Sequence, residues 1–213
     1  DKGWDYAPGA TASASILTLK DKLPALPAQI GSRMFAAWPN SGPSLDAEFS
    51  KFVNKARSEF ILGRSMVVGA LKPHWVDQAN KHGVQPQTAE IVVGDEDVHH
   101  AFDGSIHITA PSTKPRGRKS HHVPVDLDWY KSIPSHLQNP DRILLDTTDP
   151  SAPAFLLIYD LPSQVAKLVV RVNCKPRRTK GTIAFNKVRT SMLLNPGDVQ
   201  SLIGRGVIEL QKV

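Results

Sequence analysis

The sequence predicts an α+β fold, with N-terminal helices followed by a small antiparallel β-sheet of about four strands. Residues 45–62 place apolar side chains at helical spacing, and residues 142–189 contain several short runs rich in β-branched and aromatic residues. No internal repeat or heptad is visible, and 40% apolar residues are enough for a core of ordinary size. One small, non-repetitive α+β domain is therefore expected after an N-terminal extension.

Three segments are expected along the chain. Residues 1–44 are rich in Pro, Ala, Gly and Ser, a composition that interrupts helices and strands and is typical of an arm or linker. Residues 45–87 form a helical segment that opens with an amphipathic helix over 45–62, capped by Ser44 and ended by Gly63. Residues 88–213 form the remaining domain. The apolar face of the first helix is made by Leu45, Phe49, Phe52, Val53, Ala56 and Phe60.

The later elements follow from local signals. We expect a second apolar helical turn over 66–71, stopped by Pro73, and a short helix over 74–82. Acidic residues in the first turn favour a helix from Asp95, because they complement the helix dipole. The remaining expected elements are a strand over 88–93, a basic loop over 113–122, a helix over 126–137 interrupted by Pro134, and strands over 142–145, 155–159, 167–173 and 182–189.

Charge is distributed unevenly along the chain. The net charge is +6, but residues 107–213 hold 16 Lys and Arg against 8 Asp and Glu, whereas residues 1–106 hold 10 against 12. A cationic surplus attracts polyanions, of which nucleic acid is the commonest in a cell. The alternative is that the surplus serves solubility alone.

Several classes of protein are disfavoured by the composition. No run approaches the roughly 18 apolar residues of a membrane span, and the opening does not have the layout of a signal peptide. The single cysteine, Cys174, excludes an intrachain disulfide and favours a reducing compartment. No nucleotide, haem or flavin signature is present, so no cofactor is expected. Because the chain starts at Asp1, we expect it to be a fragment of a longer protein.

Two expected strands carry cations among apolar residues. Alternation in residues 168–173 places Val169, Arg171 and Asn173 on one face of a strand, with apolar side chains on the other. Lys187 and Arg189 lie in the following strand. A cation in a half-buried strand gives up hydration, so it needs an anionic partner, either a carboxylate or a phosphate.

Five separated pieces of the chain, in order, resemble one nuclease superfamily: the phage-associated branch of the barnase, EndoU, colicin and RelE-like nucleases. They are residues 95–101, 133–141, 154–159, 169–173 and 188–190. Separately, residues 1–9 resemble the short signature that closes the head-morphogenesis domain of Mu F-like phage minor capsid proteins, with Ala7 where that family often has Asn. Such capsid proteins often carry a toxin-like domain downstream.

The resemblance implies a metal-independent endoribonuclease toxin, in which a ribose 2′-hydroxyl attacks the adjacent phosphate. It assigns His100 as general acid or base, Arg171 and Arg189 as phosphate clamps, and Thr190 as a hydroxyl donor to the phosphate. RNA, transfer RNA included, is the implied substrate, and no metal or membrane is involved. Further implied partners are an acidic immunity protein and phage head or portal components, with location in the virion head and the host bacterial cytoplasm. The expected substrate-binding residues are Arg116, Arg118, Lys119, His121, His122, Asn173 and Lys187.

Alternatives remain for each assignment. His100 can be a core or capping residue, Arg189 can pair with an Asp, and His121 or His122 can supply the second proton-transfer group. A metal site built from His99, His100, Asp103 and His107 is disfavoured, because adjacent helical residues point about 100° apart. The competing function is a non-enzymatic capsid or neck accessory that binds nucleic acid through its basic C-terminal half.

Overall fold

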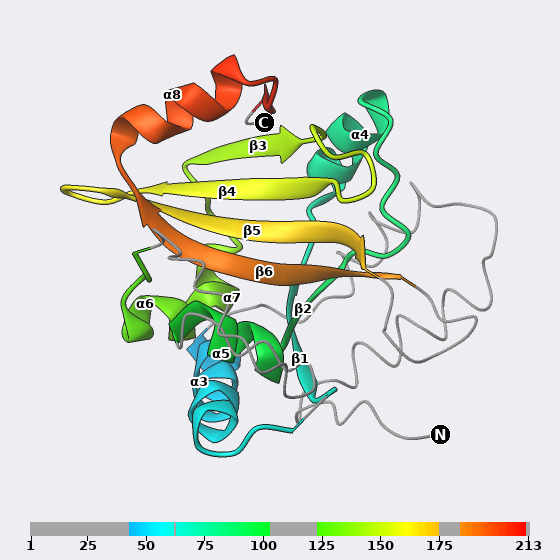
Figure 1. Ribbon diagram of the computed structural model, residues 1–213. Helices are drawn as coiled ribbons and strands as arrows, with labels where there is room; N and C mark the ends of the chain where they lie inside the picture. Colours follow the sequence, from blue (N-terminus) through cyan, green and yellow to red (C-terminus); the bar gives the residue numbers. More distant parts are fainter. Residues whose placement is uncertain (1–42, 62, 103–122, 175–183, 212–213) are drawn as a thin grey trace, which may run out of the picture.

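The structure, a computed structural model, describes residues 43–61, 63–102, 123–174 and 184–211. These residues form one twisted seven-stranded sheet in the order β1-β2-β6-β5-β4-β3-β7 (Figure 1). Neighbouring strands are antiparallel except for the parallel pair of β2 and β6. The strands are β1 (Ser65–Ala70), β2 (Glu90–Gly94), β3 (Arg142–Asp146), β4 (Ala154–Asp160), β5 (Val165–Cys174), β6 (Phe185–Leu194) and β7 (Ile208–Glu209).

Six helices in the described ranges flank this sheet. They are α3 (Pro43–Ser58), α4 (Pro73–Lys81), α5 (Asp95–Phe102), α6 (Leu127–Lys131), α7 (Ile133–His136) and α8 (Pro196–Gly204). The α+β class is therefore confirmed, but the sheet is larger than the expected four strands and is mixed rather than antiparallel. The strands expected over 142–189 correspond to β3–β6, which do form a continuous antiparallel unit.

Residues 66–71, expected as a helical turn, form strand β1 and the residue after it. All six residues of β1 are buried, so the segment is a continuous apolar run with no alternation. Periodicity alone cannot distinguish such a run from a buried helix. The first helix also ends earlier than expected, at Ser58 rather than Leu62. The expected boundary near residue 87 falls between β1 and β2, which pair in the same sheet.

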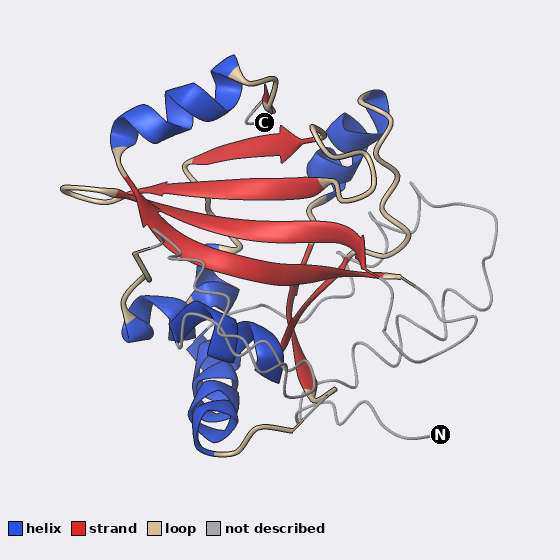
Figure 2. Cartoon of the chain, viewed as in Figure 1, coloured by secondary structure: helices blue, strands red, loops and turns tan. Residues whose placement is uncertain are grey.

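The larger core lies on one face of the sheet, here called the inner face. Helices α3, α4, α5, α6 and α7 pack there, and Figure 2 shows the helices and strands of the chain. Phe49 and Trp75 of the helices share this core with Phe155 and Leu168 of the strands. Trp75 and Phe155 lie 6.1 Å apart, centroid to centroid. Burial of this apolar area is the main stabilising contribution to the fold. No helix in these described ranges combines the length and apolar character needed to cross a bilayer.

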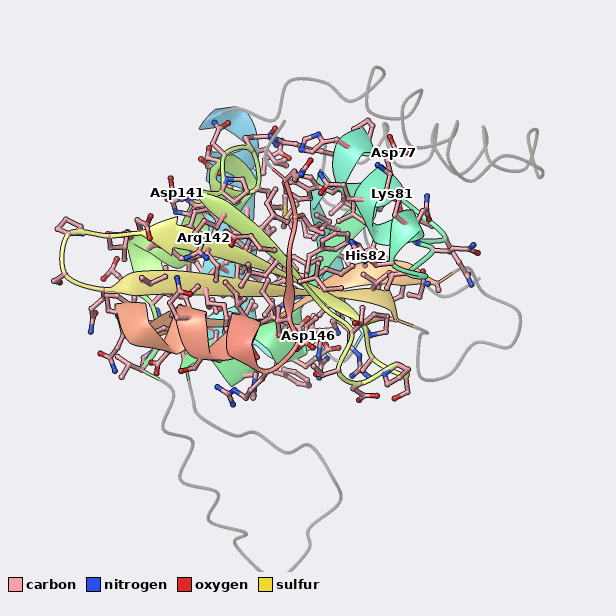
Figure 3. All side chains as sticks on the ribbon, turned by 90° about the horizontal axis from the view of Figure 1, so that it is seen from above. Asp77, Lys81, His82, Asp141, Arg142 and Asp146 are labelled. Carbon is pink, nitrogen blue, oxygen red and sulfur yellow. The ribbon has the colours of Figure 1, made fainter. Side chains whose placement is uncertain are left out.

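The opposite face, here called the α8 face, is covered in part by α8. Val199 packs there with Leu144, Leu156 and Val165 from β3, β4 and β5. The edge formed by β3 and β7 carries acids, and Figure 3 labels Asp141, Arg142 and Asp146 along it. Asp141 accepts a hydrogen bond from the Asp160 amide, and Asp146 accepts one from Thr148, so these carboxylates hold turns in place.

The inner face is packed closely enough at β1 to require glycine. A Cβ atom added at Gly69 would lie 2.8 Å from Cδ1 of Leu137, which is buried in the larger core. We expect Gly69→Ala to destabilise the protein by about 1–3 kcal/mol, because Leu137 has to move within a packed core. Urea denaturation measures the effect, with Gly204→Ala as the control, since a Cβ there meets nothing within 4 Å. Equal stability of the two variants would contradict this account.

Candidate functional site

The parallel pairing of β2 with β6 places the start of α5 beside β6. Only Ile91 and Val92 of β2 pair with β6, opposite Asn186 and Lys187, and α5 begins at Asp95 directly after β2 ends. Strand β6 continues past this point to Leu194. Its next residues therefore have the first turn of α5 as a neighbour in place of another strand.

The first turn of α5 supplies two carboxylates to cations of β6. Lys187 Nζ contacts Glu96 Oε1 and lies 3.1 Å from Asp97 Oδ2. Arg189 Nη1 lies 3.3 Å from Asp97 Oδ1. The Gly94 amide donates to Asp97 Oδ2 at 2.8 Å, so both oxygens of Asp97 are engaged. The Asp97 side chain is 2% exposed and that of Arg189 is 41% exposed, so this ion-pair cluster reaches from the interior to the surface.

A β-bulge determines which side chains accompany Lys187. Arg171 of β5 pairs with Lys187 of β6, and Val169 of β5 pairs with Thr190 of β6. Because Arg171 and Val169 are two residues apart, they share a face, and so do Lys187 and Thr190. Arg189 is the extra residue of the bulge. Without the bulge, Lys187 and Thr190 would point to opposite faces, so this local irregularity brings Arg171, Lys187 and Thr190 together on the α8 face.

Arg171 differs from the other two cations in its surroundings. It lies directly across from Lys187, an arrangement of like charges that is unfavourable without anions nearby. Among the described residues, no carboxylate lies within ion-pair distance of its guanidinium, and the more distant Asp149 is held by Ser151. Arg171 is half-buried, so an external anion would gain a charged donor there that is only partly hydrated.

The three cations of β5 and β6 lie close to the single cysteine, Cys174. Burial raises the pKa of the Cys174 thiol, while the charges of Arg171, Arg189 and Lys187 act in the opposite direction. All three cations therefore lie close enough to act on one half-buried sulfur atom. The end of β5 and the first half of β6 therefore bring three predicted site cations together, with Asp97 as a nearby negative charge.

The two carboxylates of the cluster titrate differently. Burial raises the pKa of Asp97 to about 6, and Glu96 adds to the increase, although Lys187, the Gly94 amide and Arg189 oppose it. Burial also acts on Glu96, but the charge and hydrogen bond of Lys187 outweigh it and lower the pKa. The site thus holds one carboxyl that stays ionised and one that titrates near neutrality. Carboxyl pairs separated in this way recur at functional sites.

His100 lies next to this cluster along α5. It follows Glu96 by four residues and Asp97 by three, so the three side chains are neighbours on the helix surface. His100 is exposed, whereas His99 is buried with Nε2 2.8 Å from the Ala56 carbonyl oxygen. The ring of His99 also packs edge-on against Phe60. His99 is therefore part of the core, whereas His100 lies at the surface of α5.

Two other groups of predicted site residues lie elsewhere. Asn173 has a positive φ of 55°, and its amide bonds the Gln85 carbonyl and the Gln87 amide, which fixes the loop before β2. Within the described ranges no group of three His, Cys, Asp or Glu can hold a metal ion. The remaining predicted residues lie outside the described residues: Arg116, Arg118, Lys119, His121 and His122, together with Asp103 and His107 of the metal alternative.

Asp97 and Glu96 are the site residues that sequence reasoning missed. In the sequence they are acids in the first turn of a helix, a pattern fully explained by the helix dipole. Their contact with β6 depends on a parallel pairing between strands almost 100 residues apart, which local patterns do not indicate. The alternative in which Arg189 pairs with an Asp is confirmed, and the partner is Asp97.

Comparison with known proteins identifies no relative of this chain. No protein-family model, curated protein or solved structure matches the chain.

Proposed function

We propose that this chain is a metal-independent endoribonuclease domain that cleaves RNA by attack of a ribose 2′-hydroxyl on the adjacent phosphate. The observation that carries the proposal is the convergence of Arg171, Lys187 and Arg189 next to His100, with a carboxyl group beside them that titrates near neutrality. Phosphodiester cleavage needs cations for the phosphate charge and groups that transfer protons near pH 7. This combination also agrees with the resemblance of the sequence to phage-associated nucleases.

In the proposed reaction, a bond forms between the 2′-oxygen and phosphorus while the bond from phosphorus to the 5′-oxygen breaks. One proton leaves the 2′-hydroxyl for a base, and another reaches the departing 5′-oxygen from an acid. The products are a 2′,3′-cyclic phosphate and a free 5′-hydroxyl. His100 serves in one of the two proton transfers, because an imidazole exchanges protons near pH 7.

The cations hold the phosphate in this scheme. Arg171 and Arg189 bind the two non-bridging oxygens, since a guanidinium presents donors in a planar fork that matches phosphate geometry. Thr190 shares the face of Arg171 and donates its hydroxyl to the phosphate. The Lys187 side chain is only 11% exposed, so it adds positive charge beneath the bound phosphate without being at the surface.

The resemblance also supplies the biological setting of the proposal. The domain would be carried in a phage head, act in the cytoplasm of the host bacterium, and require an acidic immunity protein in the cell that produces it. The second candidate is a capsid or neck accessory that binds nucleic acid without cutting it. Arg171 supports this second candidate. It has no ion pair among the described residues, so it can bind a phosphate whether or not the nucleic acid is then cut.

The deciding experiment is incubation of the purified chain with total RNA. We expect cleavage to proceed in excess EDTA and to leave 2′,3′-cyclic phosphate ends, which end-labelling distinguishes from linear phosphates. Loss of cleavage in EDTA with recovery on adding a divalent ion would contradict the proposal. Salt-dependent binding of RNA without cleavage would favour the accessory instead.

A further inference from the structure

Two of the three proposed phosphate-binding cations already hold an anion. Asp97 accepts contacts from Lys187 on one oxygen and from Arg189 on the other. A carboxylate between two cations resembles a phosphodiester in charge and in its paired oxygens. The anion site of the chain is therefore occupied by one of its own side chains.

Asp97 is also placed where its charge is costly. Its side chain is almost completely buried, and its neighbour Glu96 competes for the same lysine. The buried hydroxyl of Tyr130, which has no hydrogen-bond partner within the described ranges, feels the same negative charge. Burial of a carboxylate favours its neutral form. Asp97 is thus poised to lose its charge whenever another anion takes over its cations.

We propose that Asp97 is an internal substitute for the substrate phosphate, holding Lys187 and Arg189 while ionised and releasing them to a phosphodiester when it takes up a proton. The inference rests on the proposed binding of phosphodiesters by these cations. It names Asp97 as a positioning residue that regulates the same site, since a side chain this buried does not reach a substrate.

The surroundings of Asp97 give the direction of the effect. Because its pKa is about 6, Asp97 is ionised above that pH and competes with a ligand, whereas below it the cations become free. Glu96 has a lowered pKa and so keeps part of the charge of Lys187 neutralised throughout. The charged or titratable groups that face Asp97 are Glu96 and His100 on α5, Lys187 and Arg189 on β6, Tyr130 on α6 and Cys174 on β5.

The test is binding of single-stranded oligothymidylate between pH 5 and pH 8, in wild type and in Asp97→Asn. This ligand has no 2′-hydroxyl to attack its phosphates, so it is not cleaved, and none of its groups titrates in this pH range. Wild-type affinity should fall as pH rises, whereas Asp97→Asn should bind on the order of tenfold to thirtyfold more tightly at pH 7.5, because the binding-competent fraction is no longer limited by protonation. Calorimetry in two buffers should show proton uptake on binding that the variant loses.

Matched variants separate the possible results. Glu96→Gln removes a charge that raises the pKa of Asp97, so the pH dependence of binding should persist but move to lower pH. His100→Gln removes the contribution of the histidine from the pH profile. Unchanged pH dependence and proton uptake in Asp97→Asn would overturn the inference, leaving Asp97 as a fixed structural counter-ion, and so would absence of DNA binding by the wild type. RNA cleavage by the same preparations reports separately on the proposed function, since the DNA ligand is not a substrate.

Discussion

Replacing Lys187 by methionine is expected to cost about 3–5 kcal/mol of folding stability at pH 7.5, because it removes one partner of a buried ion-pair network. Lys187 contacts both Glu96 and Asp97, and Asp97 is almost completely buried. Methionine retains most of the length of the side chain, so loss of packing is small. The cost therefore arises chiefly from carboxylates left without their cation.

The pH dependence of this cost identifies its source. The folded-state pKa of Asp97, about 6, lies above its usual value of 3.8, so its contribution to stability is fully present below pH 3.8 and is lost as the pH rises through 6. Removing Lys187 raises that pKa further, since an attracting charge disappears. The penalty of Lys187→Met should consequently shrink between pH 7.5 and pH 5, as urea denaturation at the two pH values measures.

Two further variants check this explanation. Lys187→Met combined with Asp97→Asn should recover much of the lost stability, because no buried charge is then stranded. Lys131→Met removes a partly buried lysine from its 3.9 Å pair with the exposed Asp128 and should cost less than about 1 kcal/mol, because this carboxylate stays hydrated. A penalty for Lys187→Met that is independent of pH and unrelieved in the double variant would indicate a packing defect instead.

Helices α3 to α7 and the central strands were predictable because their signals are local, whereas α8 was not predicted. The amphipathic pattern of α3, the acidic first turn of α5 and the β-rich runs of β3–β6 are each contained within a short segment. Strand β1 was not predictable, since a fully buried strand has no alternating pattern. The mixed sheet was not predictable either, because it depends on β2 pairing in parallel with a strand far along the chain.

The site shows the same division between local and long-range information. Alternation placed Arg171 on one strand face, and the cations of β6 were visible in the sequence. The bulge at Arg189 was not visible, although it puts Lys187 and Thr190 on one face. Asn173 had the residue type of a ligand-binding group, but its positive φ and backbone hydrogen bonds give it a structural task. Its proposed contact with substrate stays a prediction.

The proposed chemistry predicts the largest effects for His100 and Arg189. We expect His100→Ala to lower the rate of RNA cleavage about 10²-fold to 10⁴-fold, because a proton-transfer group contributes typically that much. Arg189→Ala should cause a comparable loss, since the developing charge on the phosphate would no longer be neutralised. Cleavage of a labelled RNA under single-turnover conditions measures both.

Neither substitution is expected to unfold the protein. His100 is exposed, so thermal melting should change little in His100→Ala. Arg189→Ala takes one cation from the buried Asp97, but the loss of stability should be smaller than in Lys187→Met, because the Arg189 side chain is 41% exposed and Lys187 stays in contact with Asp97. His82→Ala and Arg142→Ala are matched controls, because His82 is exposed at the end of α4 and Arg142 lies on the far edge of the sheet, paired with Glu209 (Figure 3). They should cleave RNA at the wild-type rate.

Arg189→Lys tests whether the guanidinium group of Arg189, and not only its positive charge, is needed for cleavage. A guanidinium can hold Asp97 and a phosphate oxygen at the same time through different nitrogens, whereas an ammonium is a single point of charge. Arg189→Lys should therefore restore only part of the activity that Arg189→Ala loses. If His100→Ala or Arg189→Ala folds normally and cleaves at the wild-type rate, that residue is not catalytic. For the histidine, His121 or His122 then becomes the candidate, and for the arginine, the ion pair with Asp97 is its whole function.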